Sequence, residues 1–385
     1  MQFELLPNRR KVIWIGNEEL QIAVADGGGH IAALRFPGMP ETANPFWQPP
    51  WPSLEPAEVT NSIVDEQYGG APEGRLLASI LGHSLALDLY GAPSKEEALA
   101  GAVTHGNMGV VPWQWQLSDR QNLKGECEDT FAQLRFSRRL QVKGRSVVIE
   151  ETIQNLCASD RPIGWQQHVS LGAPFCEEGF WSQANCDRGS THPQTFGAGA
   201  SLVPGSETAW PLAPSRTGGT CDYRCALSAD AIANDFTGYR VKPGDALGSF
   251  VGGNSRFGFA LFYAWPRHFF PWMGVWDEKH ARHLNPWRQN ASVRAYEFGV
   301  SPFPESRREM MNRSSLFDLP TYLMLPGGGT LWVRYMLGVF PDVSEPGDAV
   351  FTDDSVTLMK NGRELGRVQL AEPCASSERM EMARR

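Results

Sequence analysis

The chain has 385 residues, of which 42% are hydrophobic and 20% are charged, and its formal net charge is −8. This length allows a large buried core, and the composition is typical of a globular protein. The negative charge, without a visible basic patch, argues against nucleic acid or an anionic membrane as the main partner, because both are bound through lysine and arginine. The 39 glycines and 28 prolines indicate many short turns.

The seven cysteines are irregularly spaced, and Cys221 and Cys225 lack the matching second pair of a zinc site. We therefore expect reduced thiols, no metal and no other cofactor. The N-terminal residues lack the apolar segment of a signal peptide, and no run of about 18 apolar residues occurs, so a cytoplasmic protein is expected. We expect one domain over residues 1–370, followed by a polar tail at 371–385.

Short runs of β-branched residues separated by turn residues predict strands from the N-terminus onward. Three such runs are residues 11–15, 20–24 and 30–36. The Asp-Gly-Gly-Gly sequence at 26–29 is predicted to be a hairpin turn, because the helix and Gly-Lys-Ser/Thr of a phosphate loop do not follow it. Residues 37–58 are rich in proline and contain Trp47 and Trp51, whose rings could line a site or hold the segment against the sheet.

One short helix is expected at residues 95–98, ahead of a loop that contains His105 and Gly106. Glycine after the histidine lets the backbone approach a ligand closely while the imidazole is presented. By itself, the loop with His105 and Gly106 is a weak functional candidate. Strands and turns then alternate over residues 131–142.

The segment 147–175 contains the strand around which the rest of the prediction is built. Residues 147–153 predict one strand, and residues 162–170 predict a second after a turn. Period-two alternation puts one polar set on the same face, namely Gly164, Gln166, His168 and Ser170. A lone histidine on a polar face is usually incidental, but small and polar neighbours around one titratable ring suit the wall of a sugar-sized cleft.

The C-terminal half has an aromatic segment at 265–287, which we expect to be a loop because Asn285 and Pro286 close it. For the same reason a metal site is disfavoured at the triplet Asp277, His280 and His283. Further strands are predicted at 249–251, 257–263 and 292–302, with Glu297, Gly299 and Ser301 on one face of the last. A β-hairpin is predicted from residues 321–325 and 331–336, joined by a Pro-Gly-Gly-Gly turn.

Several short motifs occur in an order that resembles the aldose 1-epimerase, or galactose mutarotase-like, superfamily. They are His105-Gly106 with Trp113, Glu151-x-x-x-Asn155, Gly164-Trp165-x-x-His168, Gly172-x-Pro174-Phe175 and Gly299-Val300-Ser301-Pro302. The resemblance implies an all-β fold, a β-supersandwich formed as a single large domain of antiparallel sheets. It also implies a small-molecule sugar as the partner, and it leaves the oligomeric state open.

The reaction that the resemblance implies is the interconversion of sugar anomers, which needs an acid and a base near the working pH. The resemblance makes His168 the acid and has His105 hold a sugar hydroxyl. The base of such enzymes is a glutamate where this chain has Ser301, and a serine hydroxyl is too weak a base near pH 7. Glu297 is a further catalytic candidate on the strand face of Ser301, but four residues of strand, roughly 13 Å, separate them, so it could take over only with a shifted substrate or a different register. Asp277 and Glu278 are other possible carboxylates. A carbohydrate-binding protein that has lost its chemistry is therefore the alternative.

We expect the sugar to occupy an open cleft between the sheets. Other candidates for sugar contacts are His83, Asp277, Trp165, Trp272 and Trp276, whose indole rings could stack on sugar faces. The arginine that such enzymes often carry near the His-Gly motif is not evident. A lyase or hydrolase would need a carboxylate pair or a tyrosine base that the sequence does not place.

Overall fold

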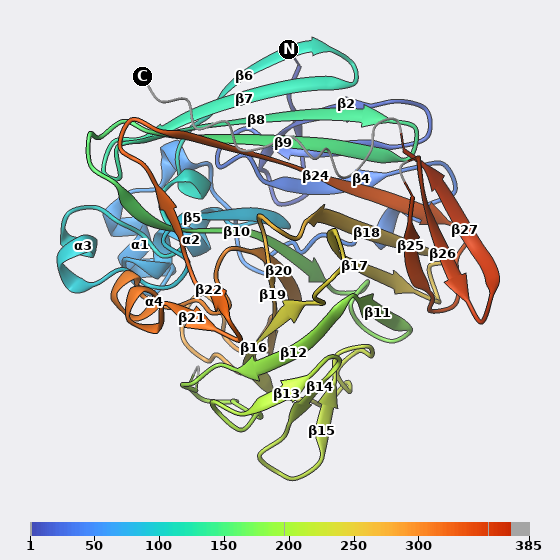
Figure 1. The fold of residues 1–385 in the computed structure, drawn as a ribbon. Coiled ribbons are helices and arrows are strands. Elements are labelled where there is room, and N and C mark those ends of the chain that lie inside the picture. The colour runs from blue at the N-terminus through green and yellow to red at the C-terminus, as the bar shows by residue number, and fades with distance from the viewer. Residues whose placement is uncertain (1, 196, 353, 371–385) are drawn as a thin grey trace.

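The computed structural model describes residues 2–195, 197–352 and 354–370, and two large antiparallel sheets account for most of its strands (Figure 1). The first sheet consists, in spatial order, of β1 (Glu4–Leu5), β2 (Lys11–Gly16), β3 (Gln21–Ala25), β4 (Ile31–Arg35), β5 (His83–Asp88), β10 (Arg161–Gly172), β20 (Ser292–Gly299), β19 (Trp272–Lys279), β16 (Ala233–Val241), β12 (Cys186–Thr191) and β13 (Glu207–Ala209), with β23 (Leu323–Leu325) also paired to β10. The predicted all-β, antiparallel fold is confirmed.

The second sheet lies across from the first. Its spatial order is β11 (Phe180–Ala184), β17 (Leu247–Asn254), β18 (Phe259–Pro266), β24 (Thr330–Pro341), β9 (Ser146–Asn155), β8 (Leu134–Lys143), β7 (Asn122–Asp129) and β6 (Gln114–Asp119). Smaller sheets are β14 (Leu212–Pro214) with β15 (Thr220–Asp222), β21 (Ser315–Leu316) with β22 (Leu319–Pro320), and β25 (Asp348–Phe351) with β26 (Ser355–Lys360) and β27 (Arg363–Gln369).

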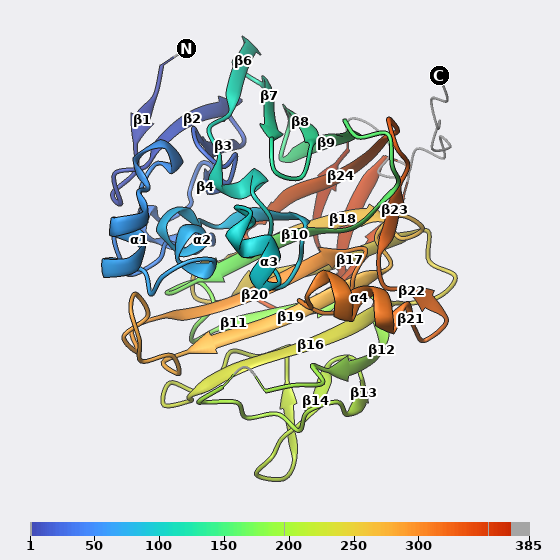
Figure 2. The same ribbon diagram turned by 90° about the vertical axis from the view of Figure 1, so that its left-hand side faces the viewer.

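Short helices gather on one side of the molecule, away from the sheet of β25–β27 (Figures 1 and 2). They are α1 (Asn61–Gln67), α2 (Glu73–Ser79), α3 (Lys95–Leu99) and α4 (Arg307–Arg313), with three 3-10 helices at Glu41–Ala43, Pro56–Glu58 and Met108–Val110. No helix within the described residues is both long and apolar enough to cross a membrane. Residues of α2 join the buried cluster on one face of the first sheet.

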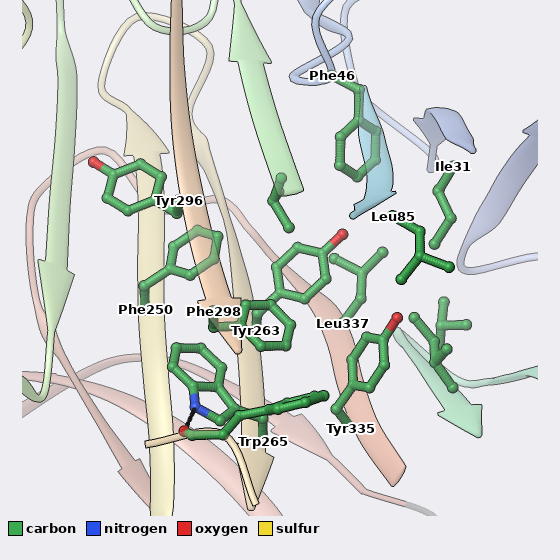
Figure 3. Packing of buried hydrophobic residues seen from close by; sticks show 14 of the residues in the cluster. Ile31, Phe46, Leu85, Phe250, Tyr263, Trp265, Tyr296, Phe298, Tyr335 and Leu337 are labelled. Carbon is green, nitrogen blue, oxygen red and sulfur yellow. Dashed lines mark hydrogen bonds between the residues drawn. The ribbon is translucent and has the colours of Figure 1, made fainter. Parts of the chain in front are cut away.

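The space between the two sheets is filled by a core of aliphatic and aromatic side chains (Figure 3). Phe298 of β20 stacks on Trp265 of β18 with ring centroids 4.1 Å apart, and Tyr296 stacks on Phe250 at 4.5 Å. Such rings bury large apolar areas and add specific stacking energy, so they fix the two sheets against each other. The expectation of an open sugar-binding cleft between the sheets is therefore wrong.

A buried ion pair of the second sheet also lies at this interface and is hydrogen-bonded across it. The carboxylate of Glu151 on β9 accepts hydrogen bonds from Arg138 Nε at 2.8 Å and from the Tyr335 hydroxyl at 2.8 Å. The β10 side chains Trp165 and Gln167 donate to its other oxygen at 3.1 and 2.6 Å. Because the charges are fully buried and paired, removing either partner would be strongly destabilising. The Glu151 of the sequence motif therefore has a structural role in the core.

Several predicted elements differ from the structure. Residues 272–279 form the central strand β19, whereas the whole segment 265–287 was expected to be a loop. The predicted C-terminal hairpin is also wrong: β23 pairs with β10, whereas β24 inserts between β9 and β18 of the other sheet. Helices α1, α2 and α4 were not predicted, because each is a single short unit of seven residues.

The tail at 371–385 lies outside the described residues, and the domain boundary at 370 stays a prediction.

Candidate functional site

A cavity of about 630 Å³ lies on the face of the first sheet that points away from the second sheet. Its floor is formed by side chains of β10, β16, β19 and β20. Its walls come from three loops and helices, at residues 68–80, 91–105 and 282–287. Segments from distant parts of the chain therefore enclose one space, large enough for a small-molecule ligand.

The cavity floor carries a histidine and a carboxyl group in direct contact. Strands β10 and β20 are antiparallel neighbours, and their register pairs His168 with Glu297, so both side chains stand on the same face. The distance from His168 Nε2 to Glu297 Oε1 is 3.2 Å. The hydroxyl of Ser170, two residues along the same face, lies 3.0 Å from His168 Nδ1. The predicted alternation of residues 162–170 is thus confirmed, and Glu297, expected far from the base position, lies beside His168.

A tyrosine that the sequence analysis did not single out holds the carboxyl group. The Tyr90 hydroxyl, just beyond the end of β5, donates a hydrogen bond of 2.7 Å to Glu297 Oε2. Because Oε2 accepts from Tyr90, a proton on the carboxyl group belongs on Oε1, where it points to His168 Nε2. Tyr90 is fully buried, and in the sequence it follows a mostly apolar strand with no motif that marks it. Its role becomes visible only from its contact with Glu297 in the folded protein.

Burial determines the protonation of this pair. Removal from water raises the pKa of Glu297 to about 8, against the opposing effect of the Tyr90 hydrogen bond. Removal from water also lowers the pKa of His168 well below its ordinary value, and the neighbouring His105 adds to the effect. At pH 7 the pair therefore consists of a protonated carboxyl and a neutral imidazole. One proton donor and one proton acceptor stand side by side.

His105 approaches the same pair from the loop that precedes β6. Its ring centroid lies 5.0 Å from that of His168, and burial lowers its pKa to about 4. Among the described residues, His105 Nδ1 and Thr104 Oγ1 are buried without a hydrogen-bond partner, and both residues line the cavity. Unsatisfied buried polar atoms at a cavity wall are suited to a ligand that brings hydroxyl groups.

Glycine at position 106 is required for this arrangement. The loop has positive φ at both His105 (66°) and Gly106 (72°). A Cβ at position 106 would lie 1.8 Å from the Leu87 carbonyl oxygen, so only glycine fits. The His-Gly motif of the sequence therefore serves a close approach of two backbone segments, which brings the imidazole to the cavity.

Aromatic and aliphatic side chains complete the walls. Trp276 of β19 lines the floor next to His168, with ring centroids 5.8 Å apart. Trp287 and Trp47 form the adjoining wall and stack on each other at 6.0 Å. The prediction for residues 37–58 left two roles open, and Trp47 has both, since it lines the cavity and packs in a buried cluster.

Solved structures similar to this chain share its architecture. They include a proposed aldose 1-epimerase from Klebsiella pneumoniae (TM-score 0.59, 13% identity, covering 87% of this chain and 80% of that one). A galactose mutarotase related enzyme from Lactobacillus acidophilus gives a TM-score of 0.56 at 12% identity, covering 87% and 99% of the two chains. The fold is galactose mutarotase-like.

The likeness is one of structure, not of close sequence. A third solved structure, of an aldose epimerase homologue from C. elegans, has a TM-score of 0.54 at 11% identity, and the match covers 86% of this chain and 99% of that one. No protein-family model matches the sequence, and no curated protein matches it. The chemistry of the site therefore follows from the residues of this chain and not from the fold alone.

The mutarotase-like fold leaves several predicted sugar contacts outside the cavity. Trp165 and Trp272 are fully buried and donate hydrogen bonds to Glu151 and to the Pro320 carbonyl, so neither ring face is open for stacking. Trp165 occupies the opposite face of β10 from His168, as strand alternation requires. Neither indole lines the cavity, whereas that of Trp276 does.

His83, Asp277 and Ser301 are likewise removed from the cavity. His83 Nε2 lies 3.0 Å from Gln167 Oε1 in the core between the sheets. Asp277 forms a buried ion pair with Arg294, with Oδ1 2.7 Å from Nε, on the face of β19 opposite to Trp276. The Ser301 hydroxyl contacts Met310 Sδ at 3.7 Å. These side chains are engaged with the protein, and no group of three histidine, cysteine or acidic residues in the described chain is arranged for a metal ion.

Proposed function

We propose that the protein binds a reducing sugar in this cavity and interconverts its anomers, with Glu297 as the acid and His168 as the base. The observation that carries the proposal is the 3.2 Å contact of these two side chains on the cavity floor. The mutarotase-like fold supports the choice of a sugar as ligand. The unpartnered polar atoms of His105 and Thr104 would receive sugar hydroxyls.

The chemistry suits an adjacent acid and base. The ring oxygen and the anomeric hydroxyl are bonded to the same carbon, so neighbouring groups can reach both. Glu297 Oε1 gives its proton to the ring oxygen while His168 Nε2 takes the proton of the anomeric hydroxyl, and the ring C–O bond breaks as the C=O bond forms. Rotation about the bond from the carbonyl carbon to the next carbon exposes the other face. Closure then reverses both proton transfers and restores the uncharged pair.

This assignment differs from the roles that the sequence resemblance implied. The resemblance made His168 the acid and implied a glutamate base at the position that Ser301 occupies in this chain. The raised pKa of Glu297 and the lowered pKa of His168, both caused mainly by burial, favour the opposite direction of proton transfer at pH 7. Ser301 then needs no catalytic part.

Proton NMR of freshly dissolved α-anomers tests the proposal. The wild-type protein should equilibrate at least one common hexose or pentose faster than buffer, and His168→Gln and Glu297→Gln should each slow it about a hundredfold or more. Ser301→Ala is the matched control, since this buried hydroxyl lies off the cavity, and its rate should stay near wild type. A wild-type trace no faster than buffer for all these sugars would support the alternative, a sugar-binding protein without chemistry.

A further inference from the structure

The cavity lining contains a polar group and an apolar group of side chains. The polar group consists of His168 and Glu297 with Thr104 and His105. The apolar group consists of Leu76, Leu77 and Ile80 of the α2 segment together with Trp47, which belong to one buried cluster. The ligand is thus expected to be polar at one end and apolar at the other.

The size of the cavity exceeds that of one sugar. A pyranose of twelve heavy atoms occupies on the order of 200 Å³ at the packing density of protein interiors, whereas the cavity measures about 630 Å³. With the anomeric carbon at His168 and Glu297, the rest of the ligand extends toward α2. Sugar hydroxyls placed there would exchange water for leucine and isoleucine side chains and lose their hydrogen bonds, which disfavours an unmodified sugar.

The charges at the cavity argue against a phosphate on the part of the ligand that extends toward α2. Arg282 is the sole lysine or arginine among the lining residues that the structure describes. Its guanidinium pairs with Glu73 Oε1 at 2.7 Å and with Glu278 Oε2 at 3.4 Å, and it lies over the Trp287 ring at 4.7 Å. Two carboxylates around one arginine leave a negative local balance, so a phosphorylated sugar would be repelled.

We propose that the natural ligand is an uncharged reducing sugar that carries an apolar group, such as an acyl ester or a deoxy carbon, at the end remote from its anomeric carbon. The orientation of this ligand rests on the proposed function, because that function places the anomeric carbon at Glu297 and His168. The apolar group lies against Leu76, Leu77 and Ile80. Its burial there supplies affinity that a hydroxyl or phosphate at the same place does not.

Isothermal titration calorimetry with matched ligands tests the inference. For glucose, galactose and mannose, the parent sugar is compared with its 6-deoxy, 6-O-butanoyl and 6-phosphate forms. Each buried methylene should tighten binding about fourfold, so for at least one sugar the butanoyl ester should bind tens of times tighter than the parent. The phosphate should bind more weakly than the parent. The inference is overturned if no ester binds better than its parent, if a phosphate binds best, or if none of these ligands binds.

Two variants show where the preference arises. Ile80→Thr introduces a hydroxyl into the apolar wall and should reduce the preference for the ester severalfold. Val64→Thr is the control, since Val64 is buried on the neighbouring helix α1 but does not line the cavity, and its ester preference should equal that of wild type. Equal preference in wild type and Ile80→Thr would contradict the placement of the apolar group, and thermal melting shows whether each variant is folded.

Calorimetry separates this inference from the proposed function, because binding needs no turnover. An ester preference without anomer interconversion would refute the proposed function and retain the two-ended ligand. Anomer interconversion without an ester preference would refute the two-ended ligand and retain the proposed function.

Discussion

Replacement of Glu297 by glutamine tests the buried, uncharged carboxyl group directly. Glutamine has the shape of a protonated glutamate: its carbonyl oxygen can accept from Tyr90, and its amide can donate to His168 Nε2. The variant therefore keeps both contacts and removes only the titration. Any pH-dependent difference in stability between the two proteins then belongs to Glu297.

The expected magnitude follows from the pKa. The pKa of Glu297 is raised from 4.5 to about 8 in the folded protein, so its stabilising contribution is present below pH 4.5 and is lost as the pH rises toward 8. One pKa unit corresponds to about 1.4 kcal/mol, so Glu297→Gln should gain about 3 kcal/mol over wild type between pH 5 and pH 8. The side chain is 3% exposed, which leaves little solvent screening to reduce the effect.

Denaturant unfolding at pH 5, 6, 7 and 8 measures this difference. The exposed Glu126, paired with Lys124 on the surface, provides the control variant Glu126→Gln, whose stability difference from wild type should be nearly constant with pH. A difference between Glu297→Gln and wild type that is also constant from pH 5 to pH 8 would refute the uncharged pair. The proton-transfer scheme would then lose its acid.

Three further predictions follow from the same geometry. Tyr90→Phe removes a hydrogen bond that lowers the pKa of Glu297, so the alkaline limb of the pH profile for anomer interconversion should move upward from about pH 8, and an unmoved limb would contradict this role. Burial lowers the pKa of His105 to about 4, so the protein should lose about 3 kcal/mol of its stability as the pH falls from 6.5 toward 4. Denaturant unfolding measures this loss, which should be smaller in His105→Gln. Gly106→Ala should lower the melting temperature far more than Gly101→Ala. Gly101 also has a positive φ, but a Cβ added there would have no atom within 4 Å. Equal effects of the two substitutions would exclude the steric clash at position 106.

The sequence by itself determined which side chains share a strand face. In residues 162–170 and 292–302, alternation with period two places His168 and Glu297 on one face of their strands and Trp165 and Phe298 on the other. This pattern is local, because successive side chains of an extended backbone point in opposite directions whatever the strand packs against. The number of such segments indicated a strand-rich chain, the resemblance implied the antiparallel all-β class, and the predicted His105 lies at the cavity.

Only the tertiary structure decided which distant segments meet. The pairing of His168 with Glu297 across β10 and β20, the Tyr90 hydroxyl on the same carboxyl group, and the cavity wall from α2 all join residues far apart in the chain. Both faces of the first sheet are buried, one by the second sheet and one by helices, so alternation could not tell the core face from the cavity face. Strand neighbours and register are set by the packing of the whole core, which no single segment encodes.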